Sequence, residues 1–141
     1  MTRSLLMIGT ALSLASVGCN AGGQDSRVGS GAIKGKVATT YDEAIALGRQ
    51  QNKPILLVSF QGTGEDVDQM ILSEPSITTL SDRFVTARIN YNTNRQDVTR
   101  LGIARLPAVM VLRPDGSLLW TKPGPTPPEV ERAMRQALAA R

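Results

Sequence analysis

The 141-residue sequence has a single cysteine, Cys19, and no histidine. One cysteine cannot form a disulfide within the chain, and thiol–disulfide exchange requires one thiolate to attack and a second thiol to resolve the mixed disulfide. The lack of histidine removes most nucleophile–base pairs and, with so little cysteine, most zinc sites. Any catalysis would therefore depend on carboxylate, lysine, tyrosine or serine side chains.

Aromatic residues are also few: one tryptophan, two tyrosines and two phenylalanines. The formal net charge is +4 and the isoelectric point is about 9.7, but the lysines and arginines are scattered along the chain. Nucleic-acid-binding surfaces cluster basic side chains and often place aromatic rings among them for base stacking. The composition therefore predicts a mildly basic, solvated surface and no nucleic-acid partner.

The N-terminus has the features of an export signal. A short basic start precedes a mostly apolar run over residues 5–17, which is shorter than the roughly 20 residues that a membrane-spanning helix needs. Residues 1–18 are therefore typical of a secretory signal peptide. The run ends at Cys19 in a pattern that resembles the lipobox of bacterial lipoproteins, with Ser16 where leucine is usual.

We expect Cys19 to be lipidated, which would anchor the exported protein to a membrane of the cell envelope and would account for its only cysteine. Cleavage after Ala21 by a general signal peptidase is the alternative, and it would leave a soluble periplasmic protein. Residues 19–36 are rich in glycine and serine, which indicates a flexible tether. Residues 37–141 are long enough for one folded domain.

Helix and strand patterns alternate in residues 37–141. A capping-box spacing at Thr40 predicts the start of a helix, and the uninterrupted apolar run at 55–58 predicts a central strand buried on both faces. The other patterns predict helices at 65–72, at 96–101 and from Thr126, strands at 85–89 and 108–112, and a hairpin through a turn at 113–117. In the helix at 65–72, the spacing of Val67, Met70 and Ile71 predicts one buried face.

This order of elements resembles that of the thioredoxin-like superfamily, in particular its secreted bacterial members. Four stretches carry the resemblance: residues 53–60 before the family's active site, residues 73–77 after the active-site helix, residues 101–107 ending in the family's cis-proline, and the hairpin at 111–116. The resemblance extends over residues 41–138. It implies an α/β, thioredoxin-like fold with a central mixed β-sheet flanked by helices, and a cis peptide bond between Leu106 and Pro107.

The departures from the family fall on the positions that carry its redox chemistry. Aligned from Phe60, Glu65 stands at the nucleophilic cysteine and Asp68 at the resolving cysteine of the family's CxxC motif. Gly64 stands at the family's tryptophan and Ser59 at its buried acid. The resemblance therefore implies the fold, argues against disulfide oxidoreductase activity, and identifies no catalytic residue, cofactor or metal ligand in this chain.

Glu65, Asp66 and Asp68 lie in the predicted first turn of a helix. Carboxylates there accept from exposed N–H groups and complement the helix dipole, and each stabilises the helix by about 0.3–1 kcal/mol. Helix capping is the simplest interpretation of these residues. A site for a hard cation such as calcium is an alternative, because Glu65 and Asp68 share a helix face, whereas a carboxylate pair for glycoside hydrolysis has no further supporting pattern.

The segment before Pro107 suggests a binding site. In the family, the backbone just before the cis-proline pairs with an extended substrate chain, and here that position is Leu106. It would face Thr63 and Gly64 across a shallow groove that the three carboxylates border. Because backbone pairing needs no particular side chain, Thr63, Gly64, Leu106 and Pro107 form a candidate peptide-binding site that favours basic partners.

The sequence thus favours a redox-inactive, thioredoxin-fold lipoprotein of the cell envelope that binds another envelope protein or an extended peptide, or serves as a scaffold. One alternative is a thioredoxin-family enzyme with unidentified non-thiol chemistry. Another is a soluble periplasmic thioredoxin-like protein. A further alternative is thiol chemistry through Cys19 in an unlipidated form.

We expect Cys19→Ser to abolish lipidation, because serine offers no sulfur for acylation. The wild type should fractionate with membranes and start at an acylated Cys19, whereas the variant should lose membrane association or be processed at another bond. Cell fractionation and intact-mass measurement check this, with Asn20→Ser as the control that keeps the wild-type behaviour. Equal membrane binding and cleavage at the same bond in the Cys19→Ser protein would contradict the prediction.

Overall fold

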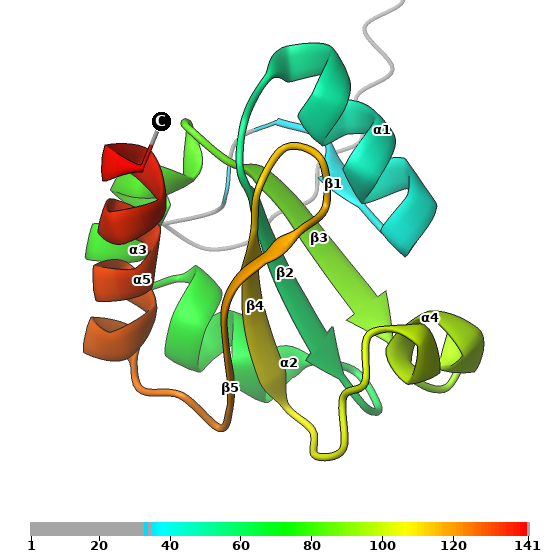
Figure 1. Ribbon diagram of the computed structural model, residues 1–141. Helices are drawn as coiled ribbons and strands as arrows, with labels where there is room; N and C mark the ends of the chain where they lie inside the picture. The colour runs from blue at the N-terminus through cyan, green and yellow to red at the C-terminus, as the bar shows by residue number, and fades with distance from the viewer. Residues whose placement is uncertain (1–32, 34, 141) are drawn as a thin grey trace, which may run out of the picture.

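The structure, a computed structural model, describes residue 33 and residues 35–140. Its centre is a five-stranded mixed sheet with the strand order β1-β3-β2-β4-β5 (Figure 1). Strands β1, β3 and β2 are parallel, β4 is antiparallel to β2, and β5 is antiparallel to β4. The elements in chain order are β1 (Val37–Ala38), α1 (Tyr41–Gln51), β2 (Ile55–Phe60), α2 (Glu65–Val67), the π-helix η1 (Asp68–Leu72), α3 (Pro75–Ser81), β3 (Val85–Asn90), α4 (Arg95–Arg100), β4 (Ala108–Leu112), β5 (Leu118–Pro123) and α5 (Pro127–Ala139).

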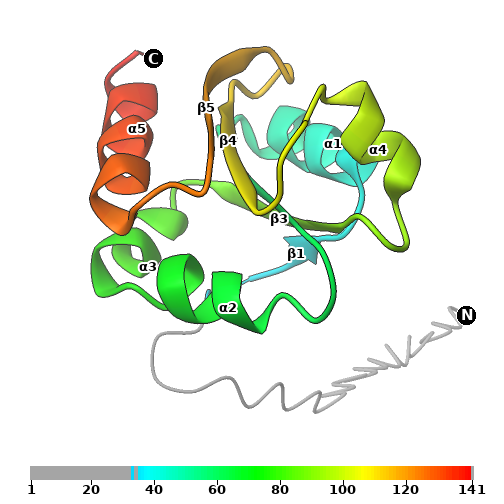
Figure 2. The same cartoon turned by 90° about the horizontal axis from the view of Figure 1, so that it is seen from below.

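Strand β2 lies at the centre of the sheet, and all six of its residues are buried. Leu56 and Val58 pack into a cluster with residues of α3 and α5, whereas Leu57 packs into a second cluster with residues of α1 and α4. Figure 2 shows the same division, with α2, α3 and α5 on one face of the sheet and α1 and α4 on the other. The α/β class, the flanked mixed sheet and the doubly buried strand expected from the sequence are therefore confirmed.

Two elements differ from the sequence prediction. The two-residue strand β1 has no periodic pattern of its own and is defined by parallel pairing with β3. The prediction of one continuous helix at 65–72 is wrong, because α2 ends at Val67 and the chain continues as the π-helix η1. Helix α3 then begins with Pro75 in its first turn, where the missing N–H of proline costs no helical hydrogen bond.

The π-helix also overturns the prediction that Met70 is buried, since its side chain is 61% exposed. An α-helix has about 3.6 residues per turn, which would place Met70 beside Val67 and Ile71. A π-turn closes one residue later, so each residue advances by a smaller angle around the axis. Leu72 consequently takes the buried position, and it is only 6% exposed.

The predicted starts of the first and last helices are confirmed. The hydroxyl of Thr40 accepts from the N–H of Glu43 at 3.2 Å, and the N–H of Thr126 donates to Glu129 Oε2 at 2.8 Å. Lys122 of β5 also contacts Glu129. Hydrogen bonds, chiefly from Lys122 and then from Thr126, lower the pKa of Glu129 to about 2. The first turn of α5 is therefore tied to the edge strand β5.

No helix in the described part of the chain is long and apolar enough to cross a membrane. The predicted signal peptide, Cys19 and the predicted tether up to residue 32 lie outside the described residues.

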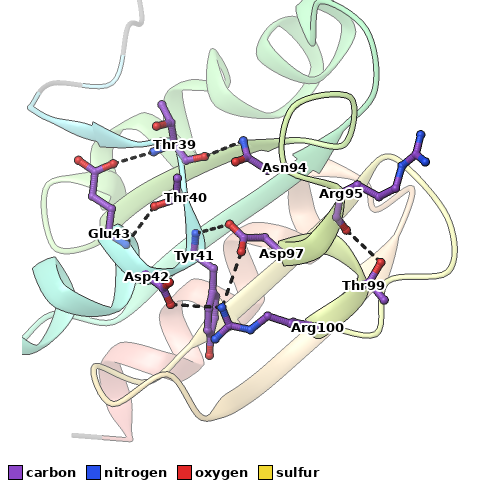
Figure 3. Close-up of polar contacts among 10 residues, drawn as sticks. All are labelled: Thr39, Thr40, Tyr41, Asp42, Glu43, Asn94, Arg95, Asp97, Thr99 and Arg100. Atoms are coloured by element: carbon purple, nitrogen blue, oxygen red, sulfur yellow. Dashed lines mark hydrogen bonds and ion pairs between the residues drawn. The ribbon is translucent and has the colours of Figure 1, made fainter.

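A polar cluster joins α4 to the start of α1 (Figure 3). The N–H of Tyr41 donates to Asp97 Oδ2 at 3.0 Å, and the side-chain amide of Asn94 donates to the carbonyl of Thr39 at 3.2 Å. The Arg100 guanidinium lies 3.3 Å from Asp42 and 3.8 Å from Asp97, and it stacks 5.0 Å above the Tyr41 ring. Asp97 thus satisfies an N–H of the first turn of α1 that the helix itself cannot satisfy.

We expect Asp97→Ala to destabilise the domain by about 1–2 kcal/mol, because the N–H of Tyr41 loses its acceptor. Asp42→Ala is the matched control: it also removes a carboxylate next to Arg100, but Asp42 is 79% exposed and its loss should cost less than about 0.5 kcal/mol. Urea unfolding of both variants measures the difference. Equal losses would show that Asp97 contributes only a surface ion pair.

Candidate functional site

The candidate site is a groove. It lies at the end of the sheet where β2 leads into α2, two elements that can be followed in Figure 1. One wall comes from the turn after β2 together with α2 and η1, and the other comes from Leu106 and Pro107, just before β4. The groove has a volume of about 480 Å³. Its lining residues are Phe60, Gln61, Thr63, Gly64, Glu65, Asp66, Val67, Met70, Leu106 and Pro107.

The structure brings together residues that are more than 40 positions apart in the sequence. Thr63 and Gly64 line the same groove as Leu106 and Pro107, as the sequence prediction required of a peptide site. The Leu106–Pro107 peptide bond is cis, which confirms that prediction. Whether a peptide occupies the groove stays a prediction.

Gly64 is buried at the start of α2 and has a φ of +75°. A Cβ atom at this position would lie 2.7 Å from the Phe60 ring and 2.8 Å from Arg88 Nη2. Both distances are far below van der Waals contact, so the backbone as it stands accepts glycine alone. The position that the sequence resemblance aligns with the family's tryptophan is therefore closed to a side chain here, because Phe60 and Arg88 occupy the space.

Arg88, on β3, is the site residue that the sequence prediction missed. Its Nη2 lies 2.8 Å from Asp68 Oδ2, and its guanidinium carbon lies 4.8 Å from the centre of the Phe60 ring. The Nε of Arg88 is buried and has no hydrogen-bond partner among the described residues. A charged residue in the middle of a largely apolar strand was the available signal, because such a residue requires a partner.

Asp68 differs from the other two carboxylates. It turns toward Arg88 and does not line the groove, so the expectation that it borders the groove with Glu65 and Asp66 is wrong. Burial raises the pKa of the Asp68 carboxyl, and the nearby Arg88 opposes that rise. Glu65 and Asp66 are exposed on the groove, and neither forms an ion pair with any described residue.

The arrangement gives the alternative cation site little support. Glu65 begins α2 and Asp68, three residues later, begins η1, and Asp68 is already paired with the Arg88 guanidinium. Among residue 33 and residues 35–140, no group of three or more histidine, cysteine, aspartate or glutamate side chains is placed to hold a metal ion. Glu65 and Asp66 in the first turn of α2 are instead suited to the positive end of the helix.

Ser59 is the residue that the sequence resemblance aligns with the family's buried acid. It is fully buried on β2, paired in register with Ile89 and Ala108, and its hydroxyl has no hydrogen-bond partner in the described part of the chain. A serine hydroxyl does not ionise near neutral pH and cannot take over the proton-shuttling role of a carboxylate. The described residues also contain no cysteine.

No protein-family model and no curated protein matches this sequence. Solved structures do match. A thioredoxin from Thermus thermophilus superimposes with a TM-score of 0.61 and 18% identity, over 77% of this chain and 88% of its own. The oxidoreductase DsbH gives a TM-score of 0.60 and 14% identity, over 86% and 96% of the two chains. A thioredoxin h from poplar gives a TM-score of 0.59 and 16% identity, over 74% of this chain and 97% of its own.

These likenesses establish the fold: the chain has the thioredoxin fold, as the sequence resemblance implied. At identities below 20%, the activity of these proteins cannot be assigned to this chain, because one fold can support many functions. The comparisons therefore show the fold alone, and the alignment that places Glu65 and Asp68 at the family's exchange positions stays a prediction.

We expect Gly64→Ala to destabilise the domain by at least about 1 kcal/mol more than Gly62→Ala. Gly62 is the matched control because its φ is +78° and a Cβ there meets no atom within 4 Å. Both substitutions carry the cost of a positive φ, about 1 kcal/mol, but only the first also displaces Phe60 and Arg88. Chemical denaturation measures the two losses, and equal losses would contradict the close contact.

Proposed function

We propose that this chain is a redox-inactive, thioredoxin-fold binding module of the cell envelope, which holds an extended segment of another protein in the groove between Thr63–Gly64 and Leu106–Pro107. The proposal has three supports: a preformed groove, backbone groups that are free to pair, and exposed carboxylates at its edge.

The free backbone of Leu106 is the observation that carries the proposal. Within the described residues, neither its N–H nor its C=O makes a hydrogen bond, although it lines the groove. An unpaired N–H and C=O at the end of a sheet can accept an extended chain by strand-like pairing. This mode of binding needs no thiol, so it is compatible with Glu65 and Asp68 at the exchange positions.

The charge at the groove supports a basic partner. Glu65 and Asp66 are exposed there without ion pairs among the described residues, so a lysine or arginine of a bound segment would complement them. Since such contacts are solvent-exposed, binding should be weak, with a Kd on the order of micromolar, and should weaken further with salt.

The N-terminal sequence supports the envelope location. An apolar run that ends at Cys19 and a glycine- and serine-rich stretch over 19–36 precede the folded domain. In this proposal, lipid on Cys19 holds the domain close to a membrane surface, where its partners would also be envelope proteins.

We expect a photo-cross-linking residue at Thr63 to capture specific envelope proteins. The matched control is the same residue at Thr79, an exposed threonine on α3 outside the groove, which should not capture them. Adding Glu65→Lys to the Thr63 cross-linker should reduce capture several-fold, while circular dichroism shows a folded domain. The purified domain should also reduce insulin disulfides no faster than buffer.

Capture of the same proteins from Thr63 and Thr79, or unchanged capture with Glu65→Lys, would show that the groove is not the functional surface. Insulin reduction above the buffer rate would show that the module is not redox-inactive.

A further inference from the structure

In the π-helix η1, the backbone hydrogen bond that an α-helix would form at Ser73 is replaced by a longer-range backbone bond and a side-chain bond. The N–H of Ser73 donates to the carbonyl of Asp68 at 2.8 Å, five residues earlier. In an α-helix it would donate to the carbonyl of Gln69. Here the hydroxyl of Ser73 donates to Gln69 at 2.6 Å. The side chain of Ser73 therefore satisfies the carbonyl that the wider turn leaves open.

Both ends of this turn are fixed. Asp68 at its start pairs with Arg88 at 2.8 Å, and Ile71 and Leu72 at its end are only 4% and 6% exposed. Between these fixed points, Met70 is 61% exposed and lines the groove. The turn thus positions a large apolar side chain at the surface, and π-turns of this kind occur frequently at functional sites.

Met70 provides an apolar surface on the groove wall that also carries the Glu65 and Asp66 carboxylates. Leu106 and Pro107 lie on the opposite wall and are partly exposed, so an apolar side chain that enters the groove meets Met70 on one side and Leu106 on the other. Methionine is unbranched and polarizable, which lets it pack against apolar groups of different shapes. An apolar contact therefore lies beside an acidic one.

The spacing of these two contacts matches an extended chain. Asp66 in α2 and Met70 in η1 are four residues apart. A π-helix rises less per residue than the roughly 1.5 Å of an α-helix, so the two residues are separated by at most about 6 Å along the helix axis. In an extended strand, side chains that point to the same side are two residues apart, or about 6.6 Å. One strand-like segment can therefore place a basic side chain at Asp66 and an apolar side chain at Met70.

We propose that Met70 is a specificity-determining residue: it selects partner segments in which an apolar residue lies two positions from a lysine or arginine that faces Asp66. This inference rests on the proposed function, because it assigns the side chains that the peptide groove recognises.

The test uses three capped, fluorescently labelled eight-residue peptides that differ only in the central motif, Lys-Thr-Leu, Lys-Thr-Ser or Glu-Thr-Leu. Binding of each peptide to the full exported chain is measured by fluorescence anisotropy. The variants are Met70→Gln, Asp66→Asn and the matched control Leu118→Gln. Leu118 is the other large apolar side chain exposed in the described residues, at 50%, and lies outside this groove.

We expect the wild type to prefer Lys-Thr-Leu over Lys-Thr-Ser by about fivefold, from partial burial of one leucine. Met70→Gln should reduce this preference below twofold and keep the preference for lysine over glutamate. Asp66→Asn should reduce the preference for lysine over glutamate and keep the preference for leucine over serine. Leu118→Gln should keep both preferences. Met70 is exposed, so unchanged unfolding curves should accompany its substitution.

Three outcomes would overturn the inference. If the wild type binds Lys-Thr-Leu but Met70→Gln keeps the full leucine preference, Met70 does not select the partner, and the proposed function stands. If Thr63 cross-linking captures partners but the wild type binds none of the three peptides, the motif is wrong, and the proposed function again stands. If both cross-linking and peptide binding fail, the proposed function falls together with the inference.

Discussion

The geometry of the candidate site depends on the Arg88 guanidinium. It lies above the Phe60 ring, 2.8 Å from Asp68 and against the backbone of Gly64. A half-buried cation requires a nearby anion, since loss of the partner leaves a charge that water only partly solvates. Positions 64 and 68 are therefore coupled: glycine is required where the arginine fills the space, and a carboxylate is required where the arginine carries its charge.

The sequence was sufficient for most of the fold because the decisive signals are local. The apolar run at 55–58 marked the central strand, and the capping boxes at Thr40 and Thr126 marked two helix starts. Strand β1 has two residues and no signal that a pattern could supply. The π-turn was not predicted because periodicity arguments assume α-helical geometry. That assumption placed Met70 on the buried face of the helix, whereas its side chain is exposed.

The candidate site was predictable only in part. The family resemblance placed Thr63, Gly64, Leu106 and Pro107 together, and the structure shows that they share one groove. The same resemblance treated Asp68 only as a replaced cysteine. Its partner Arg88 is 20 residues away on another strand, so no local pattern connects the two. Side-chain pairing across elements is the information that a single sequence does not contain.

In the proposed binding mode, the groove residues would contribute to binding in two different ways. Exposed carboxylates such as Glu65 and Asp66 stabilise a bound lysine by no more than about 1 kcal/mol each, and salt screens that attraction. They therefore influence which partner approaches more than how tightly it is held. In the proposed binding mode, retention would come from the backbone of Leu106 and from apolar contact with Met70. Phe60 and Val67 belong to one buried cluster and Leu106 packs against the other, whereas Glu65, Asp66 and Met70 are exposed and belong to neither. In the proposed binding mode, substitutions at these three exposed positions can therefore change partner preference without disturbing the core.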